Sequence, residues 1–386
     1  MMRELLKQRN AEIKMVSESE FEELLDALTD GDEWMSHPIS QMQLGYIQRG
    51  TTPAYVYSGA DASQVREAYE NGSFYLLSQG AKYLVNEVAL FTLKDRAGLN
   101  CSHTAYLLNS GFYDEFCTIY NMAFPHYQGK SSMMMLRSGQ LVCAHSSNYV
   151  MLSQQVVFET FIRKITGQFP NAKFEQANYT HDQTFCQYAL DDHKSDLMEA
   201  YVKAWKKAGF PESELSKMRP AMVCSTSDTG KYCVEMEPIL KQGPFTYPLG
   251  NKVKVKHNGS ASTREVEKRI TKCIAKLNDG LMSMSDLLAI EIQYPVASLV
   301  RAATEIGLAK SAKIALRNLV ETYKCCISPG ETVTAFELFT QICEIRYSGE
   351  FISMTKTTRD KVQDSLYQLL TYDWAANDEP GSEEVL

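Results

Sequence analysis

The sequence lacks any run of about 18–20 apolar residues, which is the length that an α-helix needs to cross a bilayer. Its first residues, Met1 to Lys7, include charges and have no apolar core of a signal peptide. We therefore expect a cytoplasmic protein of a bacterial host cell without a membrane partner. No Cys-x-x-Cys pair occurs, and the ten cysteines are typical of small buried apolar groups in a reducing compartment. No metal site and no cofactor are predicted.

Motifs for nucleotide hydrolysis and nucleophilic catalysis are also missing. Two segments, Gly129-Lys130-Ser131 and Thr229-Gly230-Lys231, resemble the end of a phosphate loop. Such a loop needs another glycine five positions before Gly129 or Gly230, and neither segment has one. Acid and imidazole adjoin at His181-Asp182 and at Asp191-Asp192-His193. Both pairs fall in predicted turns or helix starts, where Asp caps backbone amides and His is solvated. We expect a protein that is not an enzyme.

Acidic residues gather near the two ends of the chain. The net charge is −8 over 386 residues, and the acids cluster in residues 18–33 and after Trp374. Such a balance argues against a protein that coats nucleic acid everywhere, but it permits a local basic surface. The length predicts two or three packed units, and the 44% apolar content is ordinary for globular domains.

Residues 1–130 are predicted to form an N-terminal α+β region. Ser17 and Glu20 have the spacing of a capping box and predict a helix that ends at Gly31. Residues 36–60 have little periodicity and indicate a loop with short extended pieces. The apolar segment 73–93 suits either buried strands or a short helix, and the pattern does not separate the two.

Residues 131–280 are predicted to form a central domain in which antiparallel β-hairpins alternate with helices. Three hairpins are expected near 133–144, 173–190 and 221–236, with helices near 154–166 and 197–208. Gly230 supplies the positive φ that the third turn needs. A fourth strand at 252–257 and a helix that begins near 262 complete this domain.

Strand signals vanish after about residue 280. The remaining predicted helices span 282–293, 296–308, 310–325, 333–347 and 356–373. We therefore expect a helical domain over 281–375, followed by a disordered acidic tail over 376–386. Hairpins that alternate with helices, followed by helices alone, predict an α+β fold class.

The strand at 252–257 carries the clearest functional pattern. Its alternation places Lys252, Lys254 and Lys256 on one face, and the stretch from Lys241 to Lys276 has seven Lys and two Arg against two Glu. The predicted nucleic-acid site is Lys252, Lys254, Lys256, His257, Arg264, Lys268, Arg269 and Lys272. In the alternative interpretation these lysines protect a solvated edge strand from aggregation.

Four short segments carry a resemblance to known proteins: Leu136-Arg137-Ser138-Gly139, Ser147-Asn148-Tyr149-Val150, Ser225–Gly230 and Val255-Lys256-His257. On these segments the chain resembles a family of phage- and plasmid-related proteins carried by bacterial mobile elements, which is defined by a domain of unknown function. The resemblance spans about residues 130–375. It implies a setting in a phage or plasmid and supplies no established active site.

Two functional hypotheses from different classes follow. The first is a non-enzymatic, DNA-associated accessory protein of a phage or plasmid, which binds single-stranded DNA or anneals strands. A homo-oligomer is one of the assemblies expected for it. The alternative is a protein-interaction module that acts on a host defence or replication complex, with acidic ends that dock on basic partners. Salt-dependent binding of oligonucleotides favours the first, and nuclease-resistant protein partners favour the second.

Overall fold

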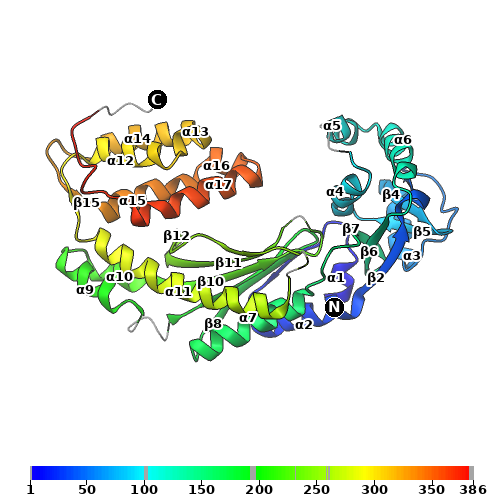
Figure 1. Cartoon of the computed structure of the whole chain (residues 1–386), viewed down its shortest axis with the longest axis horizontal. Helices are drawn as coiled ribbons and strands as arrows, with labels where there is room; N and C mark the ends of the chain where they lie inside the picture. The colour runs from blue at the N-terminus through cyan, green and yellow to red at the C-terminus, as the bar shows by residue number, and fades with distance from the viewer. Residues whose placement is uncertain are drawn as a thin grey trace.

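Two β-sheets and a group of helices follow one another along an arc-shaped molecule (Figure 1). The structure is a computed structural model, and it describes residues 2–99, 103–191, 197–230, 232–257, 259 and 261–381. A six-stranded N-terminal sheet with its helices occupies one end, a seven-stranded sheet the middle, and the C-terminal helices the other end. The α+β class is confirmed.

The central sheet is antiparallel throughout, in the order β1-β8-β9-β10-β11-β12, with β13 paired to β11 beside β12. Its strands are β1 (Glu12–Met15), β8 (Lys173–Thr180), β9 (Thr184–Ala189), β10 (Met218–Thr226), β11 (Val234–Gln242), β12 (Phe245–Pro248) and β13 (Val253–Val255). The second and third predicted hairpins are thus confirmed as β8-β9 and β10-β11.

Helices cover one face of the central sheet, and the other face turns toward the hollow side of the arc (Figure 1). The covering helices are α2 (Glu18–Gly31), α7 (Gln154–Gln168), α9 (Glu199–Lys207) and α11 (Thr263–Leu287). The Ser17 capping box at the start of α2 is confirmed. Val253 and Val255 of β13 are buried on the helix-covered side, because successive side chains of a strand point to opposite faces.

The N-terminal sheet has the order β2-β6-β7-β5-β4-β3, and β5 and β7 are its one parallel pair among the described residues. Its strands are β2 (Asp32–Pro38), β3 (Gln43–Ile47), β4 (Ser73–Ser78), β5 (Ala81–Val85), β6 (Ser131–Arg137) and β7 (Gln140–Ser146). Helices α3 (Ala62–Asn71), α4 (Glu87–Arg96), α5 (His103–Asn109) and α6 (Tyr113–Ala123) pack around it. The ambiguous segment 73–93 therefore contains two strands followed by the start of a helix.

The first predicted hairpin lies in a different sheet from the other two. Strands β6 and β7 pair with β2 and β5 of the N-terminal sheet, whereas β1 pairs with β8 of the central sheet. Residues 32–146 thus form an insertion between α2 and α7, and the expected boundary at residue 130 does not separate the two sheets. A hairpin signal describes local pairing, and it carries no information on which strand lies at its outer edge.

The C-terminal helices are α12 (Pro295–Glu305), α13 (Leu308–Ser311), α14 (Lys313–Cys326), α15 (Ala335–Cys343), α16 (Gly349–Ser353) and α17 (Lys356–Leu366). Two-residue strands, β14 (Glu291–Ile292) and β15 (Val333–Thr334), pair among them. The predicted helix over 282–293 is instead the end of α11 followed by β14. Two short helices, α1 (Met2–Leu6) and α10 (Glu212–Lys217), lie against the central domain. None of the helices in the described ranges is both long and apolar enough to span a bilayer.

Part of the expected disordered tail is held against α12. The Asp378 carboxylate accepts hydrogen bonds from the backbone amides of Gln293 and Tyr294 at 2.7 and 2.9 Å and from the Ser298 hydroxyl at 3.0 Å. Asp378 therefore satisfies amides at the start of a helix that has no side-chain cap of its own. Residues 377–379 of the tail thus contact the C-terminal helices, and residues 382–386 lie outside the described part of the chain.

Candidate nucleic-acid interface

The strand lysines predicted to bind phosphate are largely occupied inside the protein. Lys252 is only 14% exposed, and its Nζ lies 3.4 Å from Glu235 and 3.3 Å from Asp360 of α17. Lys254 lies 3.6 Å from the same Glu235. Burial alone lowers the pKa of Lys252, but the carboxylates of Glu237, Glu235 and Asp360 outweigh it and raise this pKa. Lys252 thus ties the sheet to α17 and does not lie on an open basic surface.

The basic residues on the exposed side of α11 have the opposite surroundings. Arg264, Lys268 and Lys272 are exposed and form no ion pair with any described residue. They lie four residues apart, and therefore form a row with steps of about 6 Å along one face of the helix. We call these three residues the α11 row.

The acidic residues of α11 do not neutralise this row, because they form ion pairs with other cations. Glu265 accepts a hydrogen bond of 2.6 Å from Arg269, a predicted site residue that is thereby compensated. Glu267 pairs with Arg163 of α7 at 2.7 Å, and Lys164 lies 3.9 Å away. The α11 row therefore keeps three uncompensated positive charges on one helix face.

The last two predicted residues lie where β13 leads toward α11. Lys256 is exposed and unpaired among the described residues. His257 is half-buried, stacks on Tyr149 with ring centres 5.3 Å apart, and shares a hydrogen bond of 3.2 Å between its Nδ1 and the Tyr149 hydroxyl. Burial lowers the pKa of His257. His257 is therefore part of a neutral aromatic contact and adds no positive charge.

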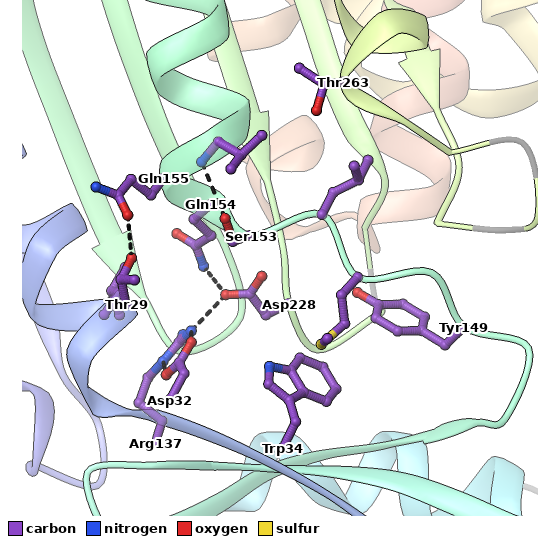
Figure 2. A pocket seen from close by; sticks show the side chains of 14 residues that line it. Thr29, Asp32, Trp34, Arg137, Tyr149, Ser153, Gln154, Gln155, Asp228 and Thr263 are labelled. Atoms are coloured by element: carbon purple, nitrogen blue, oxygen red, sulfur yellow. Dashed lines mark hydrogen bonds and ion pairs between the residues drawn. The ribbon is translucent and has the colours of Figure 1, made fainter.

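A cavity of about 430 Å³ opens beside this segment, where the two sheets meet (Figure 2). We call it the junction cavity. Trp34 of β2, Tyr149 of the β7–α7 loop and Asp228 of the β10–β11 turn line it, and it lies at the starts of two helices. Gln154 begins α7 and Thr263 begins α11. Since Arg264 follows Thr263 directly, the α11 row starts at the rim of this cavity.

The floor of the junction cavity is a buried charge cluster. Arg137, at the end of β6, donates from Nε to Asp32 Oδ1 at 2.6 Å and from Nη2 to Asp228 Oδ2 at 2.7 Å. Arg137 is 1% exposed, and burial lowers its pKa, but the attraction of Asp32 and Asp228 outweighs burial and leaves this pKa above its ordinary value. Because Asp228 belongs to the central sheet and the other two to the N-terminal sheet, this Arg137 cluster joins the sheets.

A chain of hydrogen bonds continues from the Arg137 cluster to the N-terminal segment. Arg137 Nη1 lies 3.5 Å from the Tyr179 hydroxyl, which donates to His181 Nδ1 at 3.0 Å. His181 Nε2 in turn donates to the backbone oxygen of Gln8 at 2.8 Å. The expectation of a solvated His181 is thus wrong, because both ring nitrogens have buried protein partners. Asp192 and His193 of the second predicted pair lie outside the described residues.

The turn of the third hairpin is buried at the sheet junction. His145 of β7 donates from Nε2 to the backbone oxygen of Asp228 at 2.7 Å. Gly230 has φ +69°, and a Cβ there would lie 2.4 Å from the His145 ring. Glycine is therefore required for the predicted positive φ and also for the close approach of the ring. Burial lowers the pKa of His145 to about 4, so it is neutral at pH 7.

Aromatic rings form one wall of the junction cavity. Tyr149 stacks on His145 with ring centres 3.7 Å apart and planes 8° apart. Trp34 lies nearly parallel to Tyr149, with ring centres 6.0 Å apart. Trp34 and Tyr149 both line the cavity, whereas His145 and His257, which stack on Tyr149, do not.

Sequence patterns did not single out this cavity. Its main residues, Trp34, Tyr149, Gln154 and Asp228, come from four separate segments. Two of these segments, Ser147–Val150 and Ser225–Gly230, carry the family resemblance, which is the one signal that pointed toward it. No group of three His, Cys, Asp or Glu side chains within the described ranges is arranged to hold a metal ion.

Comparison with known proteins finds no matching family model, no matching curated protein and no matching solved structure. The resemblance to phage- and plasmid-related proteins therefore stays a prediction. The α11 row and the junction cavity are therefore the features of the molecule that bear on its function.

Proposed function

We propose that this protein binds single-stranded DNA, without catalysing a reaction, along the exposed face of α11. The α11 row carries the proposal. Its three cations have no acidic partner among the described residues, although the chain as a whole has an excess of acid. Uncompensated cations at regular spacing are the chemistry that attracts a phosphate backbone, because each one releases a condensed counterion.

The aromatic wall at one end of the row favours a single strand over a duplex. Single-strand-binding proteins combine a positively charged track with aromatic rings on which unpaired bases stack. Lys256 and the α11 row would supply the track, and Trp34 and Tyr149 the rings. The predicted footprint thus narrows from eight residues to Lys256 and the three residues of the α11 row. The other four, Lys252, Lys254, His257 and Arg269, have partners inside the protein.

The resemblance extends this proposal to the DNA of a phage or plasmid in a bacterial cell. The alternative, an interaction module with acidic ends, has less support. Glu20 caps α2, Asp32 belongs to the Arg137 cluster and Asp378 caps α12, so several of the acids that it requires are used within the fold.

Binding of a fluorescent 20-nucleotide single strand at low salt tests the proposal. The Arg264→Ala, Lys268→Ala, Lys272→Ala triple variant should lose at least tenfold in affinity, since each contact with a phosphate contributes separately. The matched control removes three cations from α9 instead, with Lys203, Lys206 and Lys207 changed to Ala. Lys203 and Lys206 already pair with Glu199 and Glu212.

The two variants have the same net charge, so a general electrostatic effect would weaken both equally. We expect the α9 variant to bind within about twofold of the unmodified protein. Equal losses in both variants, or no binding by the unmodified protein at low salt, would rule the proposal out.

A further inference from the structure

Two hydrogen-bond acceptors in the junction cavity lack donors. Oδ2 of Asp228 accepts from both Arg137 and Gln154, whereas its other oxygen makes no hydrogen bond to any described residue (Figure 2). Gln154 is 4% exposed, and its Oε1 is buried without a partner among the described residues. A buried acceptor without a donor is unfavourable, so Gln154 Oε1 favours a molecule in the cavity that donates to it, and Asp228 Oδ1 can accept from the same molecule.

The orientation of the Gln154 amide follows from its neighbour. Its Nε2 donates to Asp228 Oδ2 at 2.5 Å. The opposite orientation would place two acceptors, the amide oxygen and the carboxylate oxygen, against each other. The free atom of Gln154 is therefore an oxygen. Arg137 does not donate to this oxygen, because its hydrogen bonds go to Asp32, Asp228 and Tyr179.

We infer that the junction cavity holds one unpaired base with an exocyclic amino group, taken from the strand that the α11 row binds. This inference depends on the proposed function and adds to it a preference among bases. The amino group of cytosine, adenine or guanine would donate to the free oxygens of Asp228 and Gln154. Trp34 and Tyr149 would contact the ring, as in other sites that accept an unstacked base.

The dimensions and position of the cavity agree with this assignment. Its volume of about 430 Å³ is within the range of small-molecule sites. Thr263, which lines the cavity, directly precedes Arg264, and the lining residue Tyr149 stacks on His257, which directly follows Lys256. A strand bound at the cavity would therefore have Arg264 and Lys256 nearby for phosphate contacts. Thymine has carbonyl oxygens in place of the amino group, and these would face the acceptors of Asp228 and Gln154.

Tryptophan fluorescence measures occupancy of the cavity directly. The chain has three tryptophans, of which Trp205 and Trp374 are 3% and 0% exposed, while Trp34 is half-buried at the cavity. Titration with an unstructured 20-nucleotide oligo(dC) should quench the emission of Trp34. The Trp34→Phe variant should lose this quenching and still bind the strand, as followed by anisotropy of a label on the DNA.

The preference among bases is tested with oligo(dC) and oligo(dT), which differ little in charge and length. We expect oligo(dC) to bind roughly tenfold more tightly, as for other well-formed contacts to a base edge. Gln154→Met removes the free acceptor at nearly constant size, while Arg137 still holds Asp228. This variant should reduce the preference to less than threefold and keep the dependence on salt.

Failure of this inference differs from failure of the proposed function. Equal affinity for oligo(dC) and oligo(dT), or binding that leaves Trp34 emission unchanged, would overturn the base-binding role of the cavity alone. Absence of binding to either strand at low salt would overturn the proposed function, and the cavity's role in it.

Discussion

The charges at the junction of the two sheets and the charges on α11 occupy opposite environments. Arg137 is 1% exposed and has two carboxylates within 2.7 Å, whereas Lys268 is exposed and has no acidic partner among the described residues. A buried charge without its partners is strongly destabilising, so the Arg137 cluster acts on the stability of the fold. An exposed, unpaired cation contributes little to stability and acts on charged ligands instead.

The comparison extends to the two parts of the predicted basic patch. Lys252 and Lys268 are 16 positions apart and were predicted to act together. One is neutralised by Glu235 and Asp360, and the other is free. Local charge excess in a sequence therefore does not predict which cations are available to a ligand. The four predictions below test this division, from the largest expected effect to the smallest.

Replacement of Arg137 by Met should have the largest effect. It leaves Asp32 and Asp228 buried without their cation, and we expect the free energy of unfolding to fall by about 3–5 kcal/mol. Urea unfolding followed by circular dichroism measures this loss. The same change on the α11 row, Arg264→Met, is the control and should stay within about 0.5 kcal/mol. A loss below about 1 kcal/mol for Arg137→Met would show that the cluster does not join the sheets.

Acid should destabilise the protein through the histidines beside the Arg137 cluster. Burial lowers the pKa of His145 and of His181 from 6.5 to about 4. The unfolded chain binds protons between these two pH values while the folded protein does not, so stability is lost as pH falls from 6.5 toward 4. Each imidazole contributes up to about 3 kcal/mol.

Unfolding in urea at pH 7 and at pH 4.5 measures this dependence. His145→Gln should make stability depend less steeply on pH in that range, because the amide does not titrate. An unchanged slope in this variant would show that His145 is not buried in its neutral form.

Lys252→Met and Lys268→Met form a matched pair within the predicted patch. The first leaves Glu235, which is 8% exposed, with Lys254 as its one cation among the described residues, and should cost about 1–3 kcal/mol of stability. The second should change stability by less than about 0.5 kcal/mol. DNA binding should follow the reverse order, with the larger loss in Lys268→Met. The same order in both measurements would contradict the division between compensated and free charges.

The smallest expected effect is on the salt dependence of DNA affinity. For single strands, the logarithm of the binding constant falls with the logarithm of salt concentration by about 0.7 per neutralised phosphate. Four free cations, Lys256 and the α11 row, predict a slope of about −3, and each single replacement by Ala should make it shallower by about 0.7. Replacement of Arg269, which pairs with Glu265, should leave the slope unchanged.

Much of the fold could be predicted from local patterns. The Ser17 capping box, the β8-β9 and β10-β11 hairpins and the apolar stripe of α11 are confirmed, because each depends on neighbours within a few residues. The partner sheet of the β6-β7 hairpin could not be predicted in this way, since its outer edges pair with β2 and β5, which are distant in sequence.

The properties of the candidate site also separate into those that the sequence determines and those that the tertiary structure determines. The basic character of residues 252–272 and the need for glycine at position 230 are properties of the sequence alone, because residue type and turn geometry determine them. Tertiary structure decided that Lys252 is not free, since Glu235 and Asp360 reach it only in the folded chain, whereas the pairing of Arg269 with Glu265 follows from helical spacing of four residues. It also created the junction cavity, where segments from both sheets meet around Arg137. Asp32 and Arg137 are 105 residues apart and Lys252 and Asp360 are 108 apart, so local spacing carries no record of these contacts.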